Sequence, residues 1–277
     1  MSAKAIIKRA FDYIIKGVPT YHLTANICYL NPSTKLKGKK IIVTGGGRGL
    51  GFAMAKKFIE EGASVLIAGR NEQTLIESAQ KIGSQYMVLD VSDVTSHVQF
   101  LNKAEEMLGG MDCLVNNAGV SLHEIDYSAV SQESFDTQFN TNLKGPFFFT
   151  QQFVHRIKEQ HRHATILFIS SETGETADER PYGWTKAATN SMVKGLAYRL
   201  ASDGIRVNAV APGVTASDMT GLKEDGNLYA ANSPSGRIYL PEEVAEVASF
   251  LLSDVSECIS GQVITCNNGK TINARWK

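Results

Sequence analysis

The chain has 277 residues, of which 43% are hydrophobic and 20% are charged. This composition is that of an ordinary globular protein, and it excludes a largely disordered chain. The length suits one large α/β domain or two small ones. The 28 basic and 28 acidic residues balance to a formal net charge of zero, so overall charge does not favour binding to nucleic acid.

The cysteines and the apolar stretches indicate the cellular compartment that we expect for the protein. There are four cysteines, Cys28, Cys113, Cys258 and Cys266. They form no CxxC pair, and their spacing suits neither a zinc site nor a disulfide framework. We therefore expect reduced thiols, no bound metal and a cytoplasmic location. No stretch is apolar enough to predict a transmembrane segment, and Lys8, Arg9 and Asp12 interrupt any signal peptide.

Residues 1–39 are predicted to be an N-terminal extension. The first 40 residues carry a net charge of +7, because eight basic side chains stand against Asp12 alone. Between residues 3 and 17 the apolar side chains recur at the spacing of an amphipathic helix, which Gly17 and Pro19 end. We favour a helix packed on its own domain or on a second subunit. The alternative is a weak contact of its basic face with a membrane surface or a partner.

From residue 40 onward, short apolar stretches alternate with helical patterns. Strands are predicted at 40–44, 64–68, 85–89, 111–115, 164–170, 205–210 and 262–266. Helices are predicted at 50–61, 72–82, 94–108, 131–160, 183–202 and 241–253. The strands are apolar on both faces, which is typical of a parallel sheet covered by helices on both sides. The pattern predicts an α/β fold of the Rossmann type, a doubly wound, seven-stranded parallel sheet in a single domain at 40–277.

A glycine-rich loop follows the first strand and opens a helix. Glycines let the backbone turn tightly and approach a pyrophosphate, and the helix N-terminus offers N–H groups to the phosphates. The spacing is GxxxGxG between a strand and a helix, which predicts dinucleotide binding. The predicted contacts in this loop are Thr44, Gly45, Gly47, Arg48, Gly49, Leu50 and Gly51.

The end of the second strand indicates which dinucleotide is bound. A carboxylate there would bind the ribose 2′-hydroxyl of NAD, whereas an arginine suits a 2′-phosphate. This chain has Arg70 at the strand end, and Arg48 in the phosphate loop can reach the same group. We therefore favour NADP(H) over NAD(H). The alternative is that one or both arginines are solvated surface residues.

Tyr182 and Lys186 stand four residues apart at the start of a predicted helix, and so on one face of it. A tyrosine has an ordinary pKa of about 10, which makes it a poor acid–base group at neutral pH. A nearby cation favours the phenolate and lowers that pKa. A YxxxK pattern is common by chance, so it gains weight only from its surroundings.

Those surroundings resemble the typical short-chain dehydrogenase/reductase family over residues 40–270. The matching pieces occur in the family's order: the glycine-rich loop, Asn116-Asn117-Ala118-Gly119, Asn142, Ser171, Tyr182 with Lys186, and Pro212-Gly213. The resemblance implies a carbonyl or alcohol substrate and hydride transfer with a nicotinamide cofactor. It also implies a homodimer or homotetramer packed through 131–160 and 183–202.

The resemblance implies a role for each matching residue. Tyr182 would be the general acid or base, and Lys186 would hold the nicotinamide ribose and lower the tyrosine pKa. Ser171 would hydrogen-bond the substrate oxygen, Ser170 would be structural, and Asn142 would anchor a water relay. Both Tyr182 and Lys186 would touch the cofactor. Its remaining implied contacts are Asp90, Val91, Asn116, Ala118, Gly119, Pro212, Gly213, Thr215 and Ser217.

The chain departs from the family pattern in two places. The loop between Ser171 and Tyr182 is about two residues shorter than is common, which puts the serine–tyrosine geometry in question. The last strand is followed by Asn267-Asn268-Gly269, where the family often has Asp-Gly-Gly. This second departure weakens the resemblance at the C-terminal turn and does not touch the catalytic set.

Three loops are expected to set the substrate: 120–130, with His123 as a candidate cleft residue, 172–181 and 214–236. They are mostly polar, which favours a small polar ketone or keto-sugar that the enzyme reduces. A 3-ketoacyl-thioester reductase is the alternative within the enzyme class. A different class would be a non-catalytic NADP(H) sensor or scaffold, and the complete Asn/Ser/Tyr/Lys set argues against it.

Overall fold

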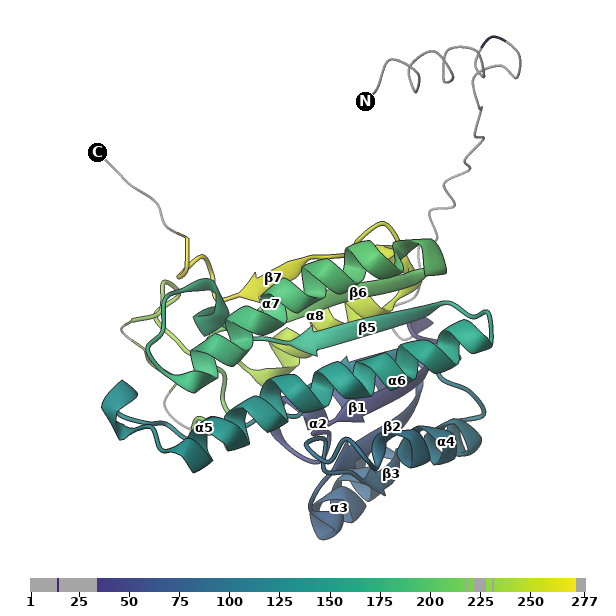
Figure 1. Cartoon of the computed structure of the whole chain (residues 1–277), viewed down its shortest axis with the longest axis horizontal. Helices are drawn as coiled ribbons and strands as arrows, with labels where there is room; N and C mark the ends of the chain where they lie inside the picture. The colour runs from purple at the N-terminus through teal and green to yellow at the C-terminus, as the bar shows by residue number, and fades with distance from the viewer. Residues whose placement is uncertain (1–13, 15–33, 218, 222–227, 231, 273–277) are drawn as a thin grey trace.

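The computed structural model describes residue 14 and residues 34–217, 219–221, 228–230 and 232–272 (Figure 1). Seven strands of these residues form one parallel sheet in the order β3-β2-β1-β4-β5-β6-β7, which confirms the predicted fold. The strands are β1 (Lys40–Thr44), β2 (Ser64–Gly69), β3 (Gln85–Val88), β4 (Cys113–Asn116), β5 (Ala164–Ile169), β6 (Ile205–Pro212) and β7 (Val263–Cys266).

Helices cover both faces of this sheet (Figure 1). One face packs on α4 (His97–Leu108), α6 (Gly145–Glu159) and α7 (Pro181–Leu200). The other packs on α2 (Gly49–Glu60), α3 (Glu72–Ile82) and α8 (Pro241–Leu252). In β1, Ile42 enters the first core while Ile41 and Val43 enter the second. This alternation of apolar side chains explains why the strands are hydrophobic throughout.

The strand order places a switch point between β1 and β4. After β1 the chain winds outward through β2 and β3, then returns to β4 and winds the other way to β7. The loops that leave β1 and β4 therefore diverge at the centre of one sheet edge. Such a crevice beyond the carboxyl ends of the strands is where doubly wound sheets bind their ligands.

The prediction of one long helix at 131–160 is wrong in one respect, because the helix is not continuous. It divides into α5 (Gln132–Phe139), a π-helical turn η3 (Asn140–Lys144) and α6. The wide turn is fixed from outside the helix. Asn142 bonds the backbone of Val120, and a Cβ at Gly145 would lie 2.2 Å from the carbonyl oxygen of Val91. A π turn takes one residue more than an α turn and is frequent at functional sites.

Other boundaries differ from the predictions by a few residues. The helix predicted from 94 begins at His97, because the Asp93 carboxylate accepts bonds from the backbone N–H and hydroxyl of Thr95 and so holds a local turn. The described residues also form short 3₁₀ turns that were not predicted: η2 (Tyr127–Ala129), η4 (Glu172–Glu175), η5 (Ala201–Asp203) and η6 (Asp254–Ser256).

The packed body begins slightly before the predicted domain boundary. Leu36 is fully buried in the α2–α3–α8 core, and Lys35 pairs with the buried carboxylate of Glu61 at 3.2 Å. The helix predicted at 3–17 lies outside the described residues apart from Ile14, so its role stays a prediction. No helix of the described part of the chain is both long and apolar enough to cross a membrane.

Candidate active site

The glycine-rich loop closes on itself after β1. Gly45 has φ +66°, and a Cβ there would lie 2.9 Å from Cα of Ala118. A Cβ on Gly51 would lie 2.1 Å from the carbonyl oxygen of Gly45, so only glycine allows the loop to fold back onto the first turn of α2. Gly49, with φ +51°, has only Ser217 nearby, at 3.5 Å from its Cβ position. The loop is thus tight at its base and open toward the sheet edge.

The open side of this loop suits an anion. Arg48 is the N-cap residue of α2, its side chain makes no capping hydrogen bond, and the first turn of the helix contains no acidic residue. The N–H groups at such a helix start carry a partial positive charge. A dinucleotide pyrophosphate fits this cradle. The residues that would hold it are Thr44, Gly45, Gly47, Arg48, Gly49, Leu50 and Gly51.

Asn117 ties the loop to β4, a role that the sequence did not suggest. Its Nδ2 donates to the carbonyl oxygens of Thr44 and Gly45, both at 3.0 Å. The Thr44 hydroxyl accepts from the backbone N–H groups of Asn117 and Ala118, each at 3.1 Å, and donates to Val115 at 3.2 Å. These bonds join the ends of two neighbouring strands. The Asn-Asn-Ala-Gly motif after β4 was the signal that could have revealed this.

The predicted adenosine end of the groove lies at the carboxyl ends of β2 and β3. Arg48 and Arg70 are both exposed there, and Asn71 caps α3 through Thr74. Asp90 is also exposed, and one of its carboxylate oxygens accepts from the backbone and hydroxyl of Ser92. Val91 differs from these groups, because it is buried in the core under α6. Its backbone, rather than its side chain, is therefore what a ligand would contact.

Ser171 and Tyr182 come together at the end of β5, despite the short loop between them. A side-chain hydrogen bond joins them, and Ser171 also caps η4 by accepting from the N–H of Thr173 at 3.3 Å. Burial raises the pKa of the Tyr182 phenol, while the bond with Ser171 lowers it. Burial prevails, so the phenol stays protonated at neutral pH. That protonation state suits a group that gives a proton away.

Lys186 lies next to Tyr182 and is buried. Its Nζ donates to the carbonyl oxygen of Ile169 at 2.8 Å and lies 5.5 Å from the centre of the Tyr182 ring. Desolvation lowers the pKa of this ammonium to about 8. The sequence led us to expect that Lys186 would lower the tyrosine pKa. In the structure the pKa of Tyr182 is instead raised, because burial of the phenol outweighs its hydrogen bond with Ser171.

Asn142 and Ser170 support this pair in different ways. Asn142 bonds both backbone groups of Val120 at 2.8 Å, and its Nδ2 also donates to Thr185 Oγ1 at 3.3 Å. It therefore connects the segment after β4 to the first turn of α7. Ser170 is buried and donates to Asn190 Oδ1 on α7 at 2.5 Å, so its hydroxyl makes a contact within the protein.

The segment after β6 faces the glycine loop across the same edge. Pro212 ends β6, and the N–H of Gly213 donates to Cys266 at 2.9 Å. The hydroxyl of Thr215 donates to the carbonyl oxygen of Gly213 at 2.9 Å, and Ser217 lies beside Gly49. The backbone of Tyr239 makes two hydrogen bonds with this segment: its N–H donates to Val214, and its carbonyl oxygen accepts from the N–H of Ala216. The sequence did not indicate this contribution.

Two of the three predicted specificity loops touch each other. His123, whose φ is +54°, bonds the carbonyl oxygen of Met219 through Nε2 at 2.8 Å. Since a carbonyl only accepts, the proton lies on Nε2. His123 thus joins loop 120–130 to loop 214–236, and its place at the substrate cleft stays a prediction. Asn116 Nδ2 donates to Thr150 Oγ1 at 2.9 Å, and a Cβ at Gly119 would lie 3.4 Å from Asn142 Oδ1.

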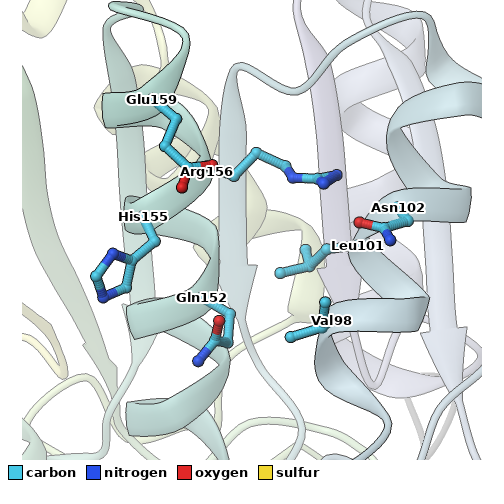
Figure 2. Close-up of a pocket in the computed structure, with 7 residues that line it drawn as sticks. All are labelled: Val98, Leu101, Asn102, Gln152, His155, Arg156 and Glu159. Atoms are coloured by element: carbon cyan, nitrogen blue, oxygen red, sulfur yellow. The ribbon is translucent and has the colours of Figure 1, made fainter.

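The hollows on the helical surface are separate from this edge. One has a volume of about 330 Å³ and lies between α4 and α6 (Figure 2). It contains none of the predicted site residues, and its lining is Val98, Leu101, Asn102, Gln152, His155, Arg156 and Glu159. Within the described residues, no three histidine, cysteine or acidic side chains gather to hold a metal ion.

Comparison with known proteins agrees with this geometry. Residues 45–271 match the sequence model of a family described as enoyl-(acyl carrier protein) reductase. That match covers most of the chain. The protein belongs to the short-chain dehydrogenase/reductase family. It is accordingly an oxidoreductase that acts on carbonyl and hydroxyl groups, as the motifs predicted.

Two curated members of the short-chain dehydrogenase/reductase family show the degree of similarity. A 3alpha-hydroxysteroid dehydrogenase from Mediterraneibacter gnavus is 34% identical over 241 residues, which cover 83% of this chain and 96% of the relative. A 3-oxoacyl-(acyl-carrier-protein) reductase from Aquifex aeolicus is 36% identical over 245 residues, covering 85% and 98%.

A solved structure of the family gives the same result for the fold. It is a 3-ketoacyl-(acyl-carrier-protein) reductase from Brucella melitensis complexed with NADH, with a TM-score of 0.79 and 29% identity. The match covers 86% of this chain and 100% of that one. The family model begins at residue 45, so the preceding residues, which include the predicted N-terminal extension, lie outside it.

Proposed function

We propose that the protein is an NADP(H)-dependent reductase of a carbonyl substrate, with Tyr182 as the proton donor. The observation that carries the proposal is the Ser171–Tyr182 hydrogen bond beside the buried ammonium of Lys186. All three side chains stand at the sheet edge that also carries the glycine-rich loop. One acid, one hydrogen-bond donor and one charged group beside a dinucleotide cradle are sufficient for carbonyl reduction.

Each side chain has a defined task in this mechanism. The nicotinamide supplies a hydride to the carbonyl carbon when the cofactor is bound. Ser171 donates a hydrogen bond to the carbonyl oxygen and orients it toward Tyr182. Tyr182 gives its phenolic proton to that oxygen, and the positive charge of Lys186 stabilises the phenolate that is left. The raised pKa of Tyr182 keeps the proton in place until the substrate oxygen gains negative charge.

Asn142 would help to return a proton to Tyr182. Its carboxamide is occupied by Val120 and Thr185, so the side chain holds the wide turn in shape. The main chain of that turn then remains as the part that can bind a water molecule. Water next to Lys186 would carry the proton from solvent.

A pair of adjacent serines gives the sharpest test of these roles. We expect Tyr182→Phe and Ser171→Ala each to reduce kcat by roughly 10²–10⁴-fold, the range that general acid catalysis contributes. NADPH affinity should change little, because neither change alters the glycine loop. Ser170→Ala is the matched control and should keep turnover, since Ser170 bonds Asn190 instead. Full activity in Tyr182→Phe would refute the proposal.

We propose NADP(H) as the cofactor because Arg48 and Arg70 are exposed where a 2′-phosphate would lie. Charge-assisted hydrogen bonds to such a group contribute about 1.5–3 kcal/mol. Arg70→Ala should therefore raise the Kd for NADPH by roughly tenfold to a hundredfold and leave that for NADH nearly unchanged. Arg199→Ala, an exposed arginine near the end of α7, is the control. Equal losses for both cofactors would contradict this assignment.

We propose a small polar ketone or keto-sugar as the first substrate class to test, because the specificity loops are largely polar. Their exposed apolar side chains favour the alternative of a 3-ketoacyl thioester. Leu122, Ile125 and Tyr127 are exposed on one loop, and Met219 and Tyr229 on another. The similarity to an acyl-carrier-protein reductase also supports the alternative. Relative kcat/KM values across both substrate classes decide between them.

The alternative of a non-catalytic sensor or scaffold is set aside, because the chain belongs to a family of oxidoreductases that act on carbonyl and hydroxyl groups.

We also propose a homodimer or homotetramer formed through α6 and α7. Phe147 and Phe148 on α6 are partly exposed, and Tyr198 on α7 is 90% exposed. A hollow of about 290 Å³ lies between these helices and is lined by Phe147, Val154 and Leu196 among others. Exposed apolar groups of this extent are typical of a surface that a partner covers.

We propose the cytoplasm as location, since Cys113, Cys258 and Cys266 are all free thiols.

A further inference from the structure

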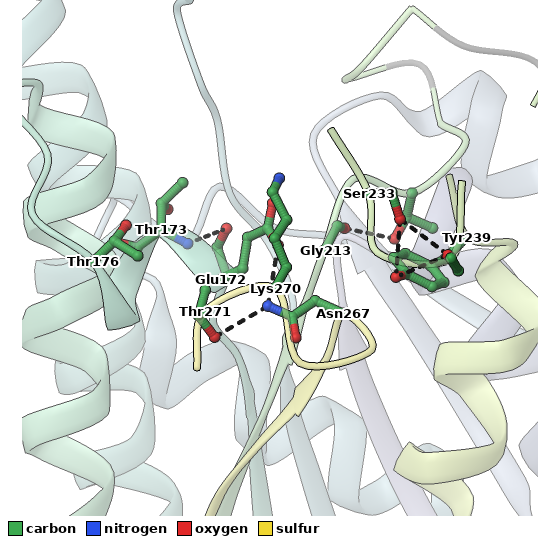
Figure 3. A network of polar contacts seen from close by, with 12 residues as sticks. Glu172, Thr173, Thr176, Gly213, Ser233, Tyr239, Asn267, Lys270 and Thr271 are labelled. Carbon is green, nitrogen blue, oxygen red and sulfur yellow. Dashed lines mark hydrogen bonds and ion pairs between the residues drawn. The ribbon is translucent and has the colours of Figure 1, made fainter. Parts of the chain in front are cut away.

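Glu172 is a buried carboxylate directly after the proposed catalytic serine. Its side chain is 10% exposed, and it forms an ion pair with Lys270 at 2.7 Å. Its second oxygen accepts from Nδ2 of Asn267 at 3.2 Å. Figure 3 shows Glu172 beside the C-terminal turn that carries Asn267, Lys270 and Thr271. Burying a carboxylate is costly unless it is paired and hydrogen-bonded, so this arrangement holds the two segments together.

The same carboxylate lies behind Gly213. A Cβ at Gly213 would lie 3.2 Å from Glu172 Oε2, 3.0 Å from Cβ of Asn267 and 2.9 Å from a ring carbon of Tyr239. Three side chains from segments far apart in the sequence therefore form the wall behind one backbone position. Gly213 is a proposed cofactor contact, and Ser171 is a proposed catalytic group. Glu172 lies behind the first and directly follows the second in the chain, so it can hold both in place.

The short helix after Ser171 is held from the opposite side as well. A Cβ at Gly174 would lie 2.9 Å from the backbone of Lys186 and from Nδ2 of Asn190 on α7. Asn190 also donates to the carbonyl oxygen of Gly174 at 3.2 Å. The segment from Ser171 to Gly174 is thus clamped between α7 and the C-terminal turn. If the pairing with the turn is lost, the serine can move away from Tyr182.

We propose that Glu172 is a positioning residue, and that Lys270 and Asn267 make the C-terminal turn part of the support of the active site. This inference rests on the proposed roles of Ser171 and Gly213. It also accounts for a departure noted in the sequence. An aspartate at 267, as the family often has, would place a second carboxylate about 3 Å from Glu172, whereas the amide of Asn267 donates a hydrogen bond to it.

Asn267→Asp is the first test, because it creates that repulsion without changing the size of the side chain. At pH 8 we expect kcat to fall at least tenfold, since displacement of a reacting group by about 1 Å can cost roughly 10²-fold. The loss should shrink as the pH is lowered, because two carboxyl groups that share a proton no longer repel each other. The double variant E172Q/N267D should recover most of the lost kcat, because the amide of Gln can donate to the new carboxylate.

Lys270→Met is a second test that leaves Asn267 in place. Displacement of Ser171 removes the hydrogen bond that lowers the pKa of Tyr182, so the phenol should titrate at higher pH in Lys270→Met than in the wild type. The difference in ultraviolet absorbance between each protein and its Tyr182→Phe derivative isolates this titration. A change that affected only folding would reduce the active fraction, counted by NADPH titration, without moving the titration of Tyr182. Lys103→Met, on the exposed face of α4, is the matched control.

The outcomes separate this inference from the proposed function. Wild-type kcat in Asn267→Asp, no recovery in the double variant, or an unmoved titration of Tyr182 in Lys270→Met would each overturn the role of Glu172. In all these cases the wild type would still turn over and Tyr182→Phe would not. Activity in Tyr182→Phe would instead show that the proposed function itself is wrong.

Discussion

Replacing the buried lysine of the active site is expected to stabilise the protein while it removes activity. Burial lowers the pKa of Lys186 from its ordinary value of 10.5 to about 8, and no carboxylate of the described residues offsets that burial. At about 1.4 kcal/mol per pKa unit, the charged lysine costs roughly 3 kcal/mol of folding free energy at pH 7. Lys186→Met removes this cost and also the hydrogen bond to Ile169, which contributes about 1 kcal/mol. The net expectation is a gain of about 2 kcal/mol.

The stability of the wild type should also depend on pH in a defined direction. Between pH 8 and 10.5 the unfolded chain holds a proton on Lys186 that the folded chain has lost. The free energy of unfolding of the wild type should therefore rise with pH over that interval, relative to the variant. The stability advantage of the variant should be largest below pH 8, vanish near roughly pH 10 and reverse above it, because the variant still lacks the hydrogen bond to Ile169.

Urea denaturation without nucleotide, at pH 7 and at pH 9.5, measures both effects. Lys194→Met, an exposed lysine on the same helix, is the control and should stay within about 0.5 kcal/mol of the wild type. A Lys186→Met variant that is less stable than the wild type at pH 7 would refute this prediction. A difference in stability that does not narrow as the pH rises would refute it as well.

Two further changes test the cradle and the proposed assembly. Gly51→Ala should abolish measurable NADPH binding by calorimetry while circular dichroism shows a folded chain, because its Cβ would lie 2.1 Å from the carbonyl oxygen of Gly45. Tight binding by this variant would mean that the loop does not fold as described. Phe148→Glu combined with Tyr198→Glu should lower the mass found by sedimentation velocity to that of a monomer, and an unchanged mass would place the subunit contact elsewhere.

Local sequence patterns were enough where an element carries its own signals. Strand β1 at Lys40–Thr44 and helix α3 at Glu72–Ile82 have the predicted bounds. The helix has a side-chain cap at Asn71 and a left-handed glycine at Gly83, both of which are readable from the sequence. The π turn at Asn140–Lys144 has no such signal, because its cause is the contact of Asn142 with a distant backbone segment.

The same distinction applies to the site. The sequence motifs named Ser171, Tyr182 and Lys186, and the structure brings these three together. The contributions of Asn117, Glu172 and Tyr239 depend on partners up to about 100 residues away, and no spacing rule predicts them. The direction of the Tyr182 pKa was also unreadable, since it follows from how deeply the phenol is buried.

The π-helical turn η3 separates two helices, α5 and α6, that contribute differently to the hydrophobic core. The α6 half buries Phe149, Phe153 and Ile157 in the core, whereas Gln138 is the one fully buried side chain of α5 among its described residues. Substitutions in α6 therefore act on stability, while those at the exposed positions of α5, such as Gln132, Glu133 and Asp136, cost little of it. These positions can thus change in evolution without compensating mutations in the core.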